Sequence, residues 1–213
     1  SLRRAQSAIE SGAFDDEIVP VEVSHRGKLK TVRSDEQPLK AQFDKIPLLK
    51  PAFKKSGTVT AANASSISDG AAAIVLMRNS EALARGIKPV AKIVSHVSHS
   101  QEPSEFTTAP IGAIEKLMDQ VNWKISEVDL FEINEAFAVV PMASIQTLGL
   151  DHSIVNVNGG ACALGHPIGC SGARIIVTLL SALQNNNRNK GVASLCIGGG
   201  EATALAVELL GLT

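Results

Sequence analysis

Three short stretches of the chain carry residue types that can move protons or stabilise negative charge. In the first, Asn134 and Glu135 follow an apolar run and precede Ala136 and Phe137. Polar side chains at the end of a strand lie at the carboxyl edge of an α/β sheet, where ligands bind. An asparagine at this point can also cap the following helix, and taken alone this stretch favours capping.

The second stretch, residues 158–172, is rich in glycine and holds one histidine, His166. Glycine lets the backbone approach a ligand closely and leaves its N–H groups free to bind it. A neutral imidazole there can act as a base or as a hydrogen-bond donor. We expect a helix from Arg174 onward, whose N-terminus favours anions. A single histidine is usually a packed or surface residue, but the surrounding glycines favour a functional one.

The third stretch is Cys196, which ends an apolar run and precedes Ile197 and three glycines beginning at Gly198. The backbone N–H groups of such a turn can point at a developing negative charge. A cysteine thiol can transfer protons, and a lowered pKa would convert it to a thiolate. The alternative is an inert buried cysteine, the role that we expect for Cys162 and Cys170.

Together and in this order, the three stretches resemble the thiolase family, over nearly the whole chain from about Ala5 to Leu210. Residues 57–72 and 48–53 also resemble the segments with which that family binds pantetheine. The resemblance implies an α/β thiolase fold with αβαβα layers, of which this chain is the C-terminal half with part of the loop domain. The implied divisions are a loop-region remnant at 1–66, the end of the N-terminal half at 67–88 and the C-terminal domain at 89–213.

The resemblance implies a role for each motif. His166 would activate a nucleophilic cysteine and help to bind the thioester oxygen of a second acyl-CoA, and Asn134 would hold a water in the same oxyanion hole. Cys196 would move the α-proton, and the N–H of Gly198 would help to form a second oxyanion hole. The residues that match the pantetheine channel of the family are Phe53, Ala61, Ser65, Ile67, Ala136 and Phe137.

The implied activity is Claisen condensation of acetyl-CoA or thiolysis of 3-ketoacyl-CoA, with coenzyme A thioesters as substrates and no metal or redox cofactor. The family's nucleophile lies in a Cys-x-Ser setting in an N-terminal half, and the cysteines of this chain all lie in the C-terminal motifs. We therefore expect the chain to be inactive alone and to need the missing N-terminal half, in a homodimer or homotetramer. The alternatives are a ketoacyl synthase, a hydroxymethylglutaryl-CoA synthase, or a non-catalytic CoA-binding module.

Composition excludes several other classes of protein. The 213 residues carry a formal net charge of −1, which argues against a nucleic-acid partner. No apolar run is long enough to span a bilayer. Three cysteines favour a reducing compartment, and we expect a cytoplasmic protein. Eleven of the 20 Lys and Arg residues fall in the first 55 positions, which indicates either a solvated surface or a basic surface near a phosphate-bearing ligand.

The apolar pattern predicts the elements that position these motifs. We expect helices at 2–11, 80–86, 111–122, 136–150 and 174–184, and strands at 15–25, 89–100, 128–134, 154–157, 192–196 and 201–210. Pro141 should kink its helix or mark a restart. Residues 26–56 read as irregular loop with short elements. The run at 71–77 reads as a buried turn and a central strand that lacks its sheet neighbours, so it should expose apolar surface.

Overall fold

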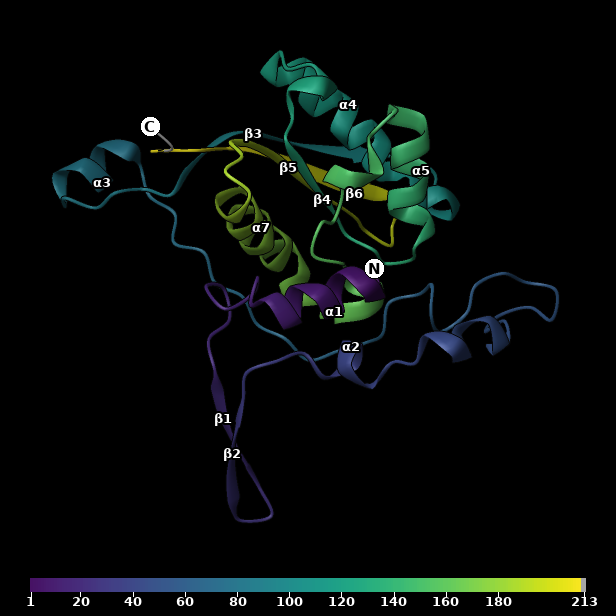
Figure 1. The fold of residues 1–213 in the computed structure, drawn as a ribbon. Helices are drawn as coiled ribbons and strands as arrows, with labels where there is room; N and C mark the ends of the chain where they lie inside the picture. Colours follow the sequence, from purple (N-terminus) through teal and green to yellow (C-terminus); the bar gives the residue numbers. More distant parts are fainter. Residues whose placement is uncertain (212–213) are drawn as a thin grey trace.

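The computed structural model describes residues 1–211, and its centre is a four-stranded mixed sheet (Figure 1). The strand order is β3-β6-β5-β4, in which β4 and β5 are parallel and the other pairs are antiparallel. The strand bounds are β3 (Ala91–Ser100), β4 (Leu130–Ile133), β5 (Lys190–Cys196) and β6 (Glu201–Leu209). The predicted strands at 89–100, 128–134, 192–196 and 201–210 are thereby confirmed, with ends that differ by at most two residues.

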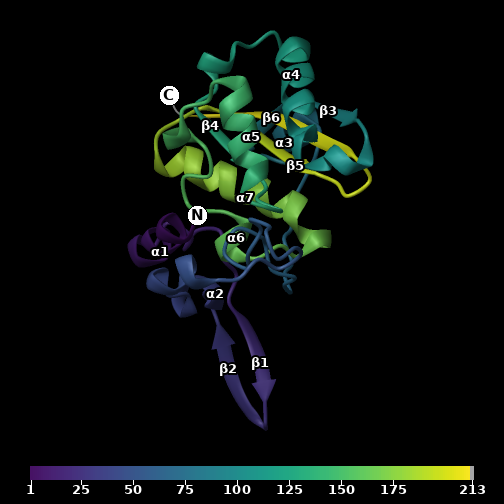
Figure 2. The same ribbon diagram turned by 90° about the vertical axis from the view of Figure 1, so that its right-hand side faces the viewer.

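Helices cover both faces of this sheet (Figures 1 and 2). One face carries α4 (Ala109–Val121) and α5 (Val139–Leu148), and the other carries α7 (Ile168–Asn185). Apolar residues of α4 at helical spacing, Ile114 and Leu117 among them, are fully buried against the sheet. Leu179 and Leu183 of α7 do the same on the opposite face. The sheet and the helices on its two faces therefore form an α/β/α sandwich, which agrees with the predicted α/β class.

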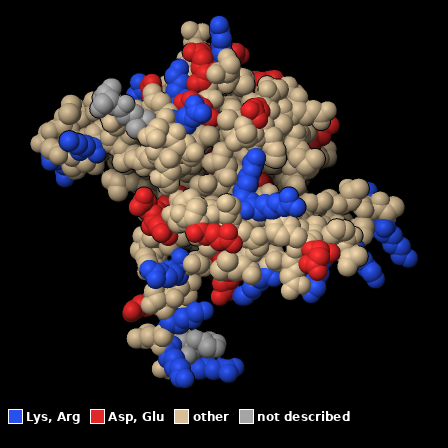
Figure 3. Space-filling view, viewed as in Figure 1, with Lys and Arg blue, Asp and Glu red and all other residues tan. Residues whose placement is uncertain are grey.

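The first 88 residues form small elements outside this sandwich. Their bounds are α1 (Leu2–Ser11), β1 (Val21–His25), β2 (Lys28–Val32), α2 (Glu36–Lys40), η1 (Phe43–Leu48) and α3 (Asn79–Ala84). The remaining short helices are η2 (Pro103–Thr108), η3 (Ile125–Glu127), η4 (His152–Ile154) and α6 (Ala161–Leu164). Figure 3 shows basic side chains gathered around the projecting β1–β2 hairpin. The helix at 2–11 is confirmed and ends at Gly12, whose φ is 74°.

Several sequence predictions were wrong in detail. The strand predicted within 15–25 is the first arm of the β1–β2 hairpin and begins only after Pro20, and the second arm lies among the short elements expected at 26–56, where no strand was identified. Residues 154–157 form only an isolated bridge. Helix α7 begins at Ile168 rather than Arg174. Pro141 lies in the first turn of α5, where its missing N–H leaves no intrahelical bond unmade, so it causes no kink.

The run at 71–77 has no regular structure, so the predicted buried turn and strand are wrong, but its predicted exposure is confirmed. Val75 is 83% exposed and Leu76 is 68% exposed. Extended apolar backbone without a neighbouring strand gains no ladder hydrogen bonds and buries little apolar surface. Among the helices of residues 1–211, none combines the length and hydropathy needed to cross a membrane.

Candidate active site

His166 is held by three separate segments of the chain. Its backbone N–H donates to the carbonyl of Ser66 at 3.0 Å. Its ring Nδ1 lies 2.6 Å from the hydroxyl of Ser171 in α7, and its Nε2 lies 3.3 Å from the amide nitrogen of Asn134 at the end of β4. Contacts at both ring nitrogens fix the plane of the imidazole, so the structure joins two of the three predicted motifs at this histidine.

The imidazole is partly buried, and this changes its acid–base behaviour. Burial lowers the pKa of His166, and the nearby guanidinium of Arg174 lowers it further. The neutral form therefore prevails at pH 7. A neutral imidazole with one unprotonated ring nitrogen can accept a proton from a substrate or from a nucleophile.

Asn134 does not cap a helix, so the capping alternative is wrong. Helix α5 begins at Val139, with Ala138 as its N-cap, five and four residues after Asn134. The Asn134 backbone instead continues the β4–β5 ladder, because its N–H donates to the carbonyl of Ser194 at 2.9 Å. Its side chain is thereby directed from the buried edge of the sheet toward His166. This is the carboxyl edge of two parallel strands, where α/β proteins bind ligands.

Hydrogen bonds to the carboxylate of Glu135 connect the glycine-rich loop to the end of β4. Its carboxylate accepts from the backbone N–H of Cys162 at 3.1 Å and from the side-chain amide of Asn156 at 3.3 Å. A Cβ at Gly160 would lie 2.5 Å from the Glu135 carboxyl carbon, so only glycine leaves room for this contact. Asn156 also pairs with both the N–H and the C=O of Ile133 at 2.8 Å. This side chain takes the place of a neighbouring strand, which explains why residues 154–157 are not one.

A buried contact between a carboxyl group and a guanidinium lies behind the histidine. Glu132 of β4 is 2% exposed, and its carboxylate lies 3.6 Å from the guanidinium of Arg174 in α7. Burial raises the pKa of Glu132 to about 8, although Arg174 opposes the shift. Glu17, which accepts from Thr178 at 3.0 Å, has its pKa raised to about 7 for the same reason. The contact of Glu132 with Arg174 connects the strand that carries Asn134 to the helix that carries Ser171.

Cys196 ends β5, the strand next to β4, and the glycine turn follows it. Burial raises the pKa of Cys196, so the resting thiol keeps its proton and is not the thiolate that a lowered pKa would give. The turn is closed by bonds from the N–H of Ile197 to Glu201 and from the N–H of Gly200 to Ile197. No acceptor among residues 1–211 takes the N–H of Gly198, which leaves it available to a ligand.

The predicted channel residues fall into two groups. Ser65 contacts Ala136. The backbone N–H and the hydroxyl of Ser65 both donate to the backbone carbonyl of Ala136, at 3.0 and 2.9 Å. Phe137 bridges to Ala64 on the same segment, and its ring packs edge-on against Phe106. Ile67, which bridges to His166, has a side chain that is 96% exposed.

Phe53 and Ala61 form the second group. Both side chains are exposed, Phe53 by 76%, and among the described residues neither forms a backbone hydrogen bond or a β-bridge with His166. Beside the histidine, residues 68–72 and 167–170 line an open hollow of about 550 Å³. A hollow of this size is within the range that accommodates small ligands.

Comparisons with known proteins identify the family of this chain. The family model described as "Thiolase, C-terminal domain" matches residues 87–209, and the one described as "Thiolase, N-terminal domain" matches residues 1–80. The chain belongs to the thiolase family. The thiolase fold is shown by the acetyl-CoA acetyltransferase of Bacillus anthracis, which superimposes with a TM-score of 0.95 at 45% identity, over 99% of this chain and 54% of that one.

Relatives of this thiolase chain are about twice its length. The "Probable acetyl-CoA acetyltransferase" of Dictyostelium discoideum is 54% identical over 99% of this chain and 51% of its own length. The Acat5 thiolase of Ascaris suum, solved in complex with coenzyme A, superimposes with a TM-score of 0.84 at 41% identity, over 98% of this chain and 53% of that one. The chain thus spans about half the length of the proteins that it matches.

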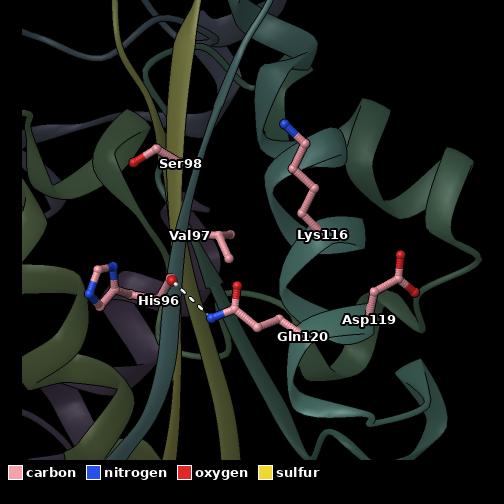
Figure 4. Close-up of a pocket in the computed structure, with 6 residues that line it drawn as sticks. All are labelled: His96, Val97, Ser98, Lys116, Asp119 and Gln120. Carbon is pink, nitrogen blue, oxygen red and sulfur yellow. Dashed lines mark hydrogen bonds between the residues drawn. The ribbon is translucent and has the colours of Figure 1, made fainter.

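A second hollow lies apart from the thiolase motifs, between the edge strand β3 and helix α4 (Figure 4). It is lined by His96, Val97, Ser98, Lys116, Asp119 and Gln120. Gln120 reaches across it to the carbonyl of His96 at 3.5 Å. Most of these side chains are exposed and polar, so this hollow is part of the solvated surface. Within residues 1–211, no group of three or more His, Cys, Asp and Glu could hold a metal ion.

Sequence reasoning missed three features of the site. Ser171 lies just before the helix expected from Arg174 onward and was assigned no role, whereas its hydroxyl contacts His166. The contact of Glu132 with Arg174 joins residues 42 positions apart, which no local pattern reveals. Asn156 was read as part of a strand, and its location between two apolar valines is the only local signal for its role.

Proposed function

We propose that this chain supplies the acid–base and oxyanion-binding residues of a thiolase that condenses acetyl-CoA or cleaves 3-ketoacyl-CoA. The observation that carries the proposal is the contact of His166 with Asn134 at the carboxyl edge of β4 and β5, in a chain of this family. The nucleophilic cysteine is proposed to come from outside residues 1–213. Cys162, Cys170 and Cys196 are all accounted for in the motifs described, and the relatives are about twice as long.

The first half-reaction assigns His166 the role of base. Its neutral imidazole accepts the proton of the nucleophilic thiol, and the resulting thiolate attacks the acyl carbon of the thioester. The bond from that carbon to the sulfur of coenzyme A breaks, and coenzyme A leaves as a thiolate that takes a proton from water. The imidazolium then donates a hydrogen bond to the thioester oxygen of the second acyl-CoA, together with a water held by Asn134. Fixed donors of this kind stabilise an enolate or tetrahedral oxyanion better than mobile water does.

The carbon–carbon bond step is assigned to Cys196. In thiolysis its S–H gives a proton to the α-carbon as the bond to the β-carbon breaks, and in condensation the thiolate takes that proton back. The raised pKa of the resting thiol suits a group that begins as the acid. The unengaged N–H of Gly198 is positioned by its turn to bind the oxygen of the acyl-enzyme.

The substrates follow from the same argument. We propose that the pantetheine arm of coenzyme A lies along Ser65, Ile67, Ala136 and Phe137, with Phe53 and Ala61 nearer its mouth. The Ascaris thiolase, which binds coenzyme A and aligns over 98% of this chain, supports this assignment. We further propose that the chemistry needs no metal or redox cofactor and that the assembly is a cytoplasmic homodimer or homotetramer. We also propose that residues 1–66 belong to the loop region of the family, residues 67–88 to the end of its first half and residues 89–213 to its second half.

A chimaeric enzyme tests the proposal directly. The part of the Dictyostelium protein outside its match to this chain is joined to residues 1–213, and formation of acetyl-CoA from acetoacetyl-CoA and coenzyme A is measured. We expect activity in the chimaera and a loss of about 10²–10⁴-fold in kcat/KM for His166→Asn and for Cys196→Ser. The matched controls are His152→Asn, an exposed histidine, and Cys162→Ser, and both should stay within a few-fold of the parent.

The 213-residue chain alone is expected to form no acetyl-CoA from acetoacetyl-CoA. If it does, the nucleophile lies within this chain and our assignment of it is wrong. A chimaera that binds coenzyme A by calorimetry but shows no acyl transfer would instead support a non-catalytic CoA-binding module.

A further inference from the structure

Ser171 is a buried residue that the proposed mechanism leaves without a role. It lies in the first turn of α7 and is only 1% exposed. Its hydroxyl donates to the carbonyl of Pro167 at 3.0 Å, four residues earlier, and also lies 2.6 Å from Nδ1 of His166. One small side chain therefore connects the backbone of the helix start to the ring of the histidine.

The number of protons available decides what this contact does. A serine hydroxyl has one proton, and a neutral imidazole has one N–H. Because the Ser171 proton is given to the Pro167 carbonyl, its oxygen can only accept from His166. With the hydroxyl proton placed in this way, Nδ1 of His166 carries the ring proton and Nε2 carries the lone pair.

The other side of the ring fits the same arrangement. The side-chain amide nitrogen of Asn134, a donor only, lies 3.3 Å from Nε2. A proton on Nε2 would face these N–H groups and leave two donors opposed. Burial and Arg174 both lower the pKa of His166, so the neutral ring to which this reasoning applies is the form present at pH 7.

We propose that Ser171 is a positioning residue: anchored on the Pro167 carbonyl, it accepts the Nδ1 proton of His166 and holds the imidazole in the tautomer with a bare Nε2. The consequence for chemistry rests on the proposed function. Only a bare Nε2 can take the proton of the nucleophilic thiol, and the proton so gained is the one that Nε2 then donates to the thioester oxygen. The opposite tautomer presents N–H to the thiol and cannot act as a base.

The tautomer can be read directly by NMR of the ¹⁵N-histidine-labelled 213-residue chain, with His166 assigned by its loss in His166→Asn. In the wild type at pH 7.5, Nδ1 should give the shift of a protonated nitrogen and Nε2 that of a bare one. Ser171→Ala removes the acceptor, so the ratio of the Nδ1–H to the Nε2–H form should fall by roughly three- to tenfold, the effect of one hydrogen bond. Ser171→Thr, which keeps a hydroxyl, should retain most of the wild-type ratio.

Ser144→Ala is the matched control. Ser144 is also buried, and its hydroxyl donates to the carbonyl of Val140 at 3.1 Å, four residues earlier, but no histidine contacts it. It should leave the His166 signals unchanged. The proposal is overturned if wild-type His166 carries its proton on Nε2, if Ser171→Ala leaves the ratio unchanged, or if Ser144→Ala shifts it equally. If Ser171→Ala does not fold, the wild-type spectrum still overturns the proposal when the proton lies on Nε2, and Ser171→Thr tests the dependence on the hydroxyl.

This measurement separates the inference from the proposed function. An inactive chimaera whose His166 still shows a protonated Nδ1 that depends on Ser171 would refute the thiolase assignment and leave the positioning role intact. An active chimaera in which Ser171→Ala changes neither kcat nor the tautomer would do the reverse. With both correct, Ser171→Ala lowers kcat by about the same three- to tenfold and leaves KM unchanged.

Discussion

Gly165, the residue before His166, allows the sharpest test of how the site is held. Its φ of 94° and ψ of 165° lie in a region that is essentially restricted to glycine. A Cβ built there would overlap the hydroxyl oxygen of Ser68 and lie 2.9 Å from its Cβ. Gly165→Ala must therefore strain the backbone and displace Ser68, which pairs with the hydroxyl of Ser66 at 2.9 Å.

The expected cost follows from these two effects. A non-glycine residue in this conformation costs about 1–3 kcal/mol, and the loss of the Ser66–Ser68 hydrogen bond adds about 1 kcal/mol. The total of about 2–4 kcal/mol falls on the segment that holds the His166 backbone, because the His166 N–H bonds to the Ser66 carbonyl. Local opening of that bond should become roughly 30- to 1,000-fold more frequent.

Native-state hydrogen exchange of the His166 amide measures this opening, and urea unfolding followed by circular dichroism measures the global stability. Gly169→Ala is the matched control, since Gly169 lies in helix α7 and a Cβ there would meet nothing within 4 Å. It should leave exchange at His166 unchanged and stability equal or up to about 1 kcal/mol higher. Equal exchange in Gly165→Ala and wild type, or equal damage in both variants, would refute the reasoning.

Three further predictions concern the stability and association of the chain. Phe131→Ala, at a side chain only 1% exposed, should lower the unfolding free energy by about 3–5 kcal/mol in urea titrations monitored at Trp123. The raised pKa of Glu17, about 7 against 4.5 unfolded, means that the folded state holds an extra proton between these values. Its contribution to the free energy of unfolding is therefore lost as pH rises from 4.5 to 7. Glu17→Gln should make that decline smaller by about 1–3 kcal/mol, as measured by urea titrations between pH 5 and 8. Val75→Ser with Leu76→Ser should reduce self-association in sedimentation and change stability by less than about 0.5 kcal/mol, because both side chains are exposed.

The sequence predicted the sandwich better than it predicted the segments around it. Helix α4 and strands β3, β5 and β6 were expected because their apolar spacing matches the faces that they bury. The segment at 71–77 misled the same reasoning, because a run of apolar residues indicates burial only where a neighbour exists to cover it. The β1–β2 hairpin was half missed, since its second strand is mostly exposed and lacks an apolar alternation.

The site residues were predictable to the extent that their motifs are local. His166, Asn134, Cys196 and Gly198 were identified from short stretches, and the structure directly joins the first two. The buried carboxyl groups of Glu132 and Glu17 were not predicted as part of the site. The raised pKa of Glu132 arises from its burial and from charges on other elements. Sequence spacing carries no record of such through-space effects.

Strand order explains how motifs more than 30 residues apart come to serve one site. β4 and β5 are neighbours and parallel, so their carboxyl ends emerge at the same edge. The pairing of Ile133 with Ser194 and the bond from the Asn134 N–H to the Ser194 carbonyl set their register. A shift of one residue in that register would turn Asn134 to the opposite face of the sheet, away from His166. The buried side chain of Asn156, which pairs with Ile133 at the free edge of β4, is thus as important to the site as the residues that touch the histidine.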